Sequence, residues 1–103
     1  DITAEYILQY VRTKQNAMGN NVENLYKLLG DRVEALEFKI GENAPIVGIE
    51  LQKMNLKKDL IICGIMHEGK FILPCGESTV SVGDSIIVVT AQKQLNDVAD
   101  ILR

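Results

Sequence analysis

The segment that decides the fold is residues 60–102, which read LIICGIMHEGKFILPCGESTVSVGDSIIVVTAQKQLNDVADIL. It begins with an apolar run, turns at Glu68-Gly69, and continues as a short apolar stretch that ends at Pro74. A polar stretch and the pair Gly83-Asp84 then lead into a second apolar run. Apolar runs rich in β-branched residues predict strands, and Glu68-Gly69 predicts a hairpin turn.

The end of this segment has helical spacing. The apolar positions that recur on one helical face are Leu95, Val98, Ala99 and Leu102. They predict an amphipathic helix that starts near Ala91 and packs against the sheet. The apolar runs 60–65 and 86–89 are typical of strands that are covered on both faces. One terminal helix and one short helix are too little cover, so we expect an isologous dimer to supply the second layer.

The first half of the chain predicts three more elements. Residues 2–12 have apolar side chains at helical spacing and predict a leading helix. Residues 22–29 and 33–40 flank the turn signal Gly30-Asp31 and predict a hairpin, with Leu36, Phe38 and Ile40 on one face. Residues 46–53, after Pro45, have the spacing of one or two helical turns. The expected fold class is α+β: a β-hairpin followed by a small βαββ-type sheet with a C-terminal helix.

Length and charge exclude several classes of protein. The chain has 103 residues, which fits one compact domain or one domain with an appended arm. Its net charge of -3 provides no basic field that would attract nucleic acid. No apolar run approaches the roughly 20 residues needed to cross a bilayer. The chain starts at Asp1 without an initiator methionine, from which we expect that a longer chain was cut.

The reactive residue types do not form a catalytic or metal-binding pattern. Cys63 and Cys75 match neither a disulfide framework nor a metal motif, and both fit a reducing, cytoplasmic location. His67 has no partner carboxylate or second histidine at ligand spacing, so we interpret it as structural or solvated. Cys63 and His67 lie four residues apart on one predicted strand, about 13 Å by strand rise, too far for a nucleophile and its base. Asp84 is expected to hydrogen-bond the local backbone of its turn. We therefore predict no enzyme activity.

The order of the elements and several short pieces resemble the TrkA C-terminal (RCK C-terminal) domain of Trk-type potassium uptake regulatory proteins. The pieces are Tyr10-Val11-Arg12, Glu34-Ala35-Leu36-Glu37-Phe38, GIELQKMNL at 48–56, the run 60–65, Pro74, and Val82-Gly83-Asp84 before 86–89. No single piece is diagnostic, but they follow the family's order and approximate spacing over nearly the whole chain.

The resemblance implies a domain organisation and a role. Residues 1–21 would be a linker helix and loop from an N-terminal nucleotide-binding domain, and residues 22–103 the regulatory domain. NAD(H) or an adenine nucleotide is expected only in that N-terminal domain, because this chain lacks its phosphate loop and carries no cofactor site. The implied role is regulation and dimerisation within a gating subunit that controls potassium uptake. The expected partners are a second copy, a higher ring in the full-length protein, and a membrane-embedded potassium transporter, at the inner face of the plasma membrane.

Other attachments of the same module stay open at this point. The alternatives are another cation or anion transporter, or a transcription regulator with an upstream helix-turn-helix. Only the upstream sequence would separate these.

Some relatives bind cyclic di-adenosine monophosphate between two subunits, and the resemblance implies where such a cleft would lie. The corresponding positions here are Met54, Asn55, Lys57, Ile61 and Pro74. Pro74 matches the family pattern. Met54 and Asn55 stand where those relatives have an isoleucine and an arginine, and Ile61 stands where they have an asparagine. Lys57 can replace the lost charge only as a point charge, since lysine lacks the arginine fork that grips phosphate.

Overall fold

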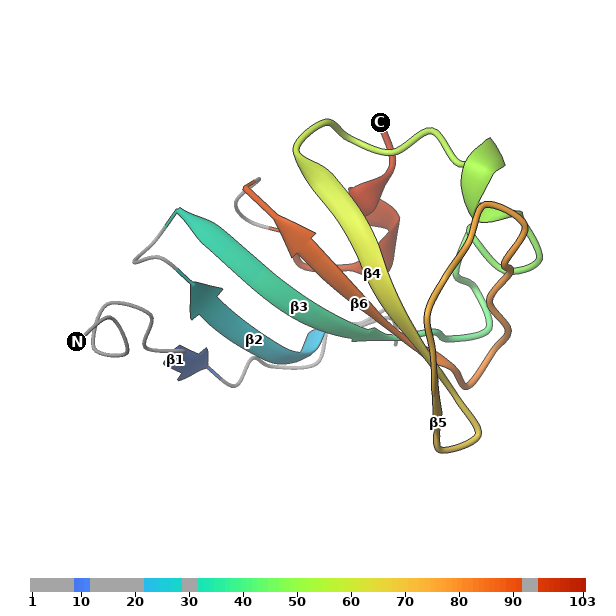
Figure 1. Ribbon diagram of the computed structural model, residues 1–103, viewed down its shortest axis with the longest axis horizontal. Helices are drawn as coiled ribbons and strands as arrows, with labels where there is room; N and C mark the ends of the chain where they lie inside the picture. The colour runs from blue at the N-terminus through green and yellow to red at the C-terminus, as the bar shows by residue number, and fades with distance from the viewer. Residues whose placement is uncertain (1–8, 12–21, 29–31, 92–94) are drawn as a thin grey trace.

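The computed structural model describes residues 9–11, 22–28, 32–91 and 95–103 (Figure 1). Within these ranges one antiparallel sheet of six strands has the order β1-β2-β3-β6-β4-β5. The strands are β1 (Gln9–Val11), β2 (Val22–Leu28), β3 (Val33–Lys39), β4 (Leu60–His67), β5 (Lys70–Ile72) and β6 (Ser85–Thr90). The helical elements of the described residues are two short 3-10 helices, η2 (Leu51–Lys53) and η3 (Val98–Ile101).

Both hairpins predicted from the sequence are present. β2 pairs with β3, and β4 pairs with β5, in antiparallel register. The turn of the second hairpin has positive φ at both central residues, 50° at Glu68 and 79° at Gly69. Two positive φ angles belong to the type I′ turn, whose twist matches that of the flanking strands. Gly69 adopts this backbone freely, whereas Glu68 adopts it at a steric cost.

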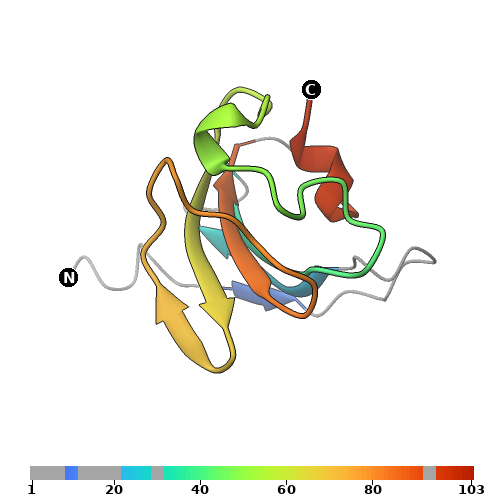
Figure 2. The ribbon, with the colours of Figure 1, turned by 90° about the vertical axis from the view of Figure 1, so that its right-hand side faces the viewer.

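The core lies on one face of the sheet. Residues Leu36 and Phe38 of β3 and Ile86 and Val88 of β6 alternate onto this face and are buried, as the period of two predicts for β3. The side chains that cover them come from loops and from η3: Ile40, Ala44, Ile46, Val80, Leu95, Val98 and Ile101. Figure 2 shows the segment after β3 and the C-terminal η3 on the same side of the sheet.

The predicted helices differ most from the structure. The described residues contain no α-helix. Of the leading helix expected over 2–12, residues 2–8 and 12 lie outside the described ranges. At 9–11 the structure has β1, which pairs with β2. The turns expected over 46–53 reduce to the single 3-10 turn η2.

The C-terminal helix is a four-residue 3-10 turn for two physical reasons. Asp97 caps its start by accepting a hydrogen bond from the Ala99 amide, and Asp100 accepts from the Asp97 amide in return. Leu102 then leaves helical geometry, at φ -86° and ψ 150°, and forms a β-bridge with Leu56. This contact between residues far apart in sequence ends the helix. In this short turn Val98 and Ile101 are both fully buried. Ile101 was not among the residues predicted for the apolar face of the helix.

The other face of the central strands, called the open face below, was expected to be covered as well. Its apolar side chains are Ala35, Ile61, Met66, Phe71, Ile87 and Val89. Ile61 is 59% exposed and Phe71 is 57% exposed. A register shift at Cys63 places Gly64 on this face, where an added Cβ would lie 2.5 Å from Phe71 Cε1. The Phe71 ring therefore packs directly over the backbone of β4.

The β4–β5 turn yields a stability prediction. We expect Glu68→Asn to raise the free energy of unfolding by about 0.5–1 kcal/mol, because asparagine tolerates the left-handed backbone better than glutamate does. Urea denaturation above the titration range of His67 would measure the change. Glu68→Gln is the matched control, since it removes the same charge without the backbone advantage. Equal stability of the two variants would contradict the prediction.

Candidate functional site

The turn before β6 is built around Gly83 and Asp84. Gly83, at φ 94°, donates its amide to the Ile40 carbonyl at 2.9 Å, and the Ile40 amide donates to the Asp84 carbonyl at 2.8 Å. These bonds tie the turn to the end of β3. Asp84 is 4% exposed, and its Oδ2 accepts a hydrogen bond from the Ser81 amide at 2.9 Å. The prediction that Asp84 bonds the backbone of its own turn is confirmed.

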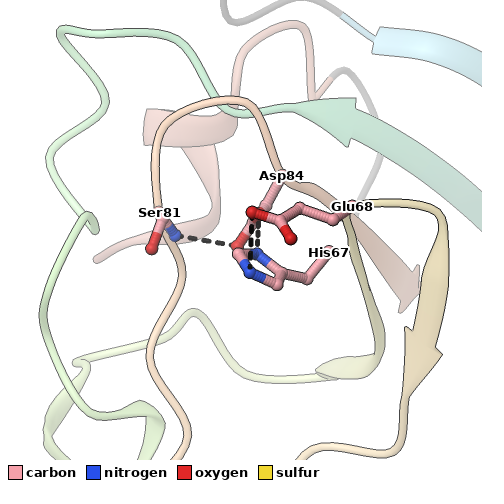
Figure 3. Close-up of polar contacts among 4 residues, drawn as sticks. All are labelled: His67, Glu68, Ser81 and Asp84. Carbon is pink, nitrogen blue, oxygen red and sulfur yellow. Dashed lines mark hydrogen bonds and ion pairs between the residues drawn. The ribbon is translucent and has the colours of Figure 1, made fainter.

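Asp84 has a second partner that the sequence analysis did not find. His67 Nδ1 lies 2.6 Å from Asp84 Oδ1, so the imidazole and the carboxylate are hydrogen-bonded (Figure 3). His67 ends β4, and the register Met66↔Ser85 brings the end of β4 beside the start of β6. The residues are 17 positions apart in sequence, and only this register reveals the pair. The interpretation of His67 as lacking a carboxylate partner was therefore wrong.

The pair makes the imidazole more basic. The hydrogen bond and the charge of Asp84 raise the pKa of His67 above 6.5, and Glu68 adds a smaller contribution in the same direction. Partial burial acts in the opposite direction and does not cancel them. His67 Nε2 lies 3.6 Å from Glu68 Oε2 (Figure 3). Two carboxylates therefore favour the imidazolium, one near each ring nitrogen.

A small depression adjoins the pair. It has a volume of about 230 Å³ and is lined by Ile65, His67, Ile72, Thr79, Ser81 and Asp84. In a catalytic triad the histidine nitrogen distal to the aspartate takes the proton of a nucleophile. Here that nitrogen, Nε2, faces the Glu68 carboxylate. The arrangement therefore differs from a triad, because a second carboxylate stands where the nucleophile would be.

The five positions considered for a nucleotide cleft fall on different parts of the molecule. Asn55 and Lys57 lie beside the C-terminal segment: the Asn55 carbonyl accepts from the Arg103 amide at 2.9 Å, and the Lys57 amide donates to the Ile101 carbonyl at 2.8 Å. Met54, between them and η2, packs against the core.

Ile61 and Pro74 lie elsewhere. Ile61 is on the open face, at a depression of about 450 Å³ that it shares with Val33, Asp59, Leu60, Val89, Thr90 and Ala91. Pro74 is half-buried in the loop after β5. Neither this depression nor the one beside His67 combines the five positions.

The two cysteines are free thiols in different surroundings. Cys63 is half-buried at the register shift of β4, where the strict alternation of strand faces is interrupted. Cys75 is exposed in its loop, with Sγ 3.5 Å from the Ser78 hydroxyl oxygen. The hydrogen bonds from Ser78 and from the Glu77 backbone lower the pKa of the Cys75 thiol. An exposed thiol of this kind ionises more readily than a buried one.

Two features are absent from the described part of the chain. It contains no group of three or more His, Cys, Asp or Glu side chains arranged to hold a metal ion. It also has no helix of the length and apolarity required to span a membrane.

Comparison with known proteins points to one family. The model of the TrkA-C domain matches residues 35–103. The Trk system potassium uptake protein TrkA homolog 2 of Methanosarcina mazei is 27% identical over 86 residues, which are 84% of this chain and 19% of that protein. The TrkA homolog of Pyrococcus abyssi is 26% identical over 70 residues, 67% of this chain and 31% of that protein. The potassium uptake protein TrkA of Azorhizobium caulinodans is 24% identical over 102 residues, 99% of this chain and 21% of that protein. The chain thus spans less than a third of the length of these relatives.

The geometry of the turn predicts the cost of removing the Asp84 carboxylate. We expect Asp84→Ala to lower the free energy of unfolding by about 1–3 kcal/mol, because the Ser81 amide and the imidazole both lose their acceptor. Asp84→Asn keeps an oxygen for the Ser81 amide and should cost less. Urea denaturation of both variants near neutral pH tests this, and an Asp84→Ala variant as stable as the wild type would refute it.

Proposed function

The chain belongs to the TrkA-C domain family, and from this premise we propose that it is the C-terminal regulatory and dimerisation domain of a cytoplasmic gating subunit that controls potassium uptake through a membrane transporter. The observation that carries the proposal is the family match, which covers β3 to the C-terminus. The matched relatives are named as potassium uptake proteins, which supports the same transport process for this chain. Its role in that process is non-catalytic: it holds subunits in a defined geometry.

The proposed domain organisation places residues 1–21 as the connection from an N-terminal nucleotide-binding domain. The low share of the relatives' length that this chain spans supports further domains in the full protein. NAD(H) or an adenine nucleotide would bind there. Since β1 pairs with β2, part of this connection is built into the sheet of the regulatory domain. Movement of the upstream domain would therefore pull directly on the edge of the sheet.

We propose the open face as the surface that meets a second copy. Ile61 and Phe71 expose more than half of their area, and both project from the same side of β4 and β5. Burying such side chains contributes about 1.5–3 kcal/mol each. A two-fold axis would place the same apolar patch on both partners, so that each covers the other. In the full protein, such dimers would combine into a ring next to the transporter.

Regulation requires an effector that distinguishes two states of this assembly. Nucleotide binding in the upstream domain, or a ligand of the regulatory domain itself, would favour one arrangement of the subunits. The change would reach the transporter through the dimer, since the dimer fixes the distance between neighbouring subunits.

The dimer is open to a direct test. We expect the chain to sediment as a dimer at micromolar concentration. Ile61→Lys or Phe71→Lys should raise the dissociation constant of the dimer by about tenfold to a hundredfold, because each places a charge in an apolar contact. Val82→Lys is the matched control, since Val82 is 48% exposed but lies in the loop before β6. A wild-type chain that sediments as a monomer would refute the dimer. Equal weakening by the control would refute the chosen face.

Ligand binding by the regulatory domain gives a second prediction. We expect calorimetric titration with cyclic di-adenosine monophosphate to show no tight binding, because Asn55 and Ile61 provide no bidentate grip on phosphate. Tight binding would contradict this expectation. Its loss in Asn55→Ala or Lys57→Ala, but not in Lys39→Ala, would then place the cleft at the five positions considered above.

A further inference from the structure

The His67–Asp84 pair lies where β4 ends and where β5 and β6 begin. The backbone pairing of β4 with β6 stops at Met66↔Ser85, and the pairing of β4 with β5 stops at His67↔Lys70. The side-chain bond between His67 and Asp84 continues the connection of β4 with β6 one step beyond the last backbone rung. It therefore anchors the base of the β4–β5 turn to the turn before β6.

Of the two strands of this hairpin, β4 is paired along β6, whereas β5 and the turn have few other contacts to hold them. β5 is an edge strand of three residues, all of them exposed, and among the described strands it pairs only with β4. Segments with few buried contacts open at low free energy, so one additional bond changes their opening equilibrium measurably. A change in the strength of the His67–Asp84 bond should therefore have its largest effect on the opening of this edge.

The charges around the imidazole favour its protonated form. Asp84 faces it from the turn before β6, and Glu68 faces it from the β4–β5 turn. Lys70 is its register partner on β5, and the loop residues Thr79 and Ser81 that share its depression are uncharged. Two carboxylates against one ammonium leave a net attraction for the imidazolium.

We propose that His67 and Asp84 form a proton-operated clasp, which holds the β4–β5 hairpin against the turn before β6 when His67 is protonated and loosens it when His67 is neutral. The bond between imidazolium and carboxylate is charge-assisted and about twice as strong as the neutral bond that replaces it. The inference does not depend on the proposed function. If the open face does form the dimer, the clasp also makes dimerisation pH-dependent, because Phe71 belongs to both the hairpin and that face.

The sign of the pH dependence follows from the raised pKa of His67. The clasp contributes its full stability below the unfolded-state value of about 6.5, where the imidazole is charged in both states. That contribution is lost as the pH rises from there through the higher folded-state pKa. Opening of the hairpin should therefore increase on going from mildly acidic to mildly alkaline conditions.

The single histidine of the chain makes the test direct. An NMR titration of the imidazole Cε1–H reports His67 alone. We expect its pKa to lie above 6.5 in the native protein and to return toward 6.5 in urea and in Asp84→Asn. A native pKa at or below the value in urea would overturn the proposal.

Hydrogen exchange tests the mechanical part. After correction for the intrinsic exchange rate, the protection of the Lys70 and Ile72 amides, which belong to the hydrogen-bonded pairs of this hairpin, should fall as the pH rises in the wild type, and should stay level in His67→Gln. Amides of β3 serve as the internal control and should not respond in either protein. Loss of protection that is the same in both proteins, or absent in both, would overturn the clasp. These readouts stay interpretable if the chain proves monomeric, so failure of the clasp and failure of the proposed dimer are distinguishable.

Discussion

The pairing of β6 with both β3 and β4 is the constraint on which the rest of the structure depends. β6 follows β5 in sequence but lies between β3 and β4, and it is paired along both of its edges. Ile86 and Val88 are fully buried as a consequence, and the loop before β6 must return across the core face to reach its place. That return brings Val80 into the core and aligns Asp84 with the end of β4. Both the core and the His67–Asp84 pair thus follow from one strand insertion.

The parts of the fold that the sequence predicts are those whose cause is local. The two hairpins depend on alternation and on turn residues that are neighbours in the chain, and both were predicted correctly. The C-terminal helix was not, because the reciprocal caps of Asp97 and Asp100 start the turn at Val98 and the pairing of Leu102 with Leu56 ends it after four residues. Helical spacing at Leu95, Val98 and Leu102 is present in the sequence. It gives no warning of a partner almost fifty positions away.

The candidate site likewise combines a local contact that the sequence predicts with a long-range contact that it does not. Asp84 was predicted to bond its own turn, and it does so through the Ser81 amide. Its bond to His67 depends on the register between β4 and β6, which a single sequence does not reveal. Continuous apolar runs likewise predicted strands with two covered faces. A continuous apolar run indicates that both faces of a strand require burial. It does not indicate whether the second face is covered by the same chain or by a partner, which depends on how many other helices and strands the chain has.

A regulatory domain of this kind needs a stiff centre and responsive edges. The ladder of β3, β6 and β4 supplies the stiffness, since its buried side chains and paired backbone open only with the whole domain. β5 and its turn supply the response, since their residues are exposed and Glu68 occupies a strained backbone conformation. A change in the charge of His67 acts on this edge without disturbing the core. The interaction that it alters is the hydrogen bond between the imidazole and the Asp84 carboxylate. In the proposed dimer, coupling between this edge and the subunit contact would require no chemistry, because a small change in the position of Phe71 would alter the surface presented to the second copy.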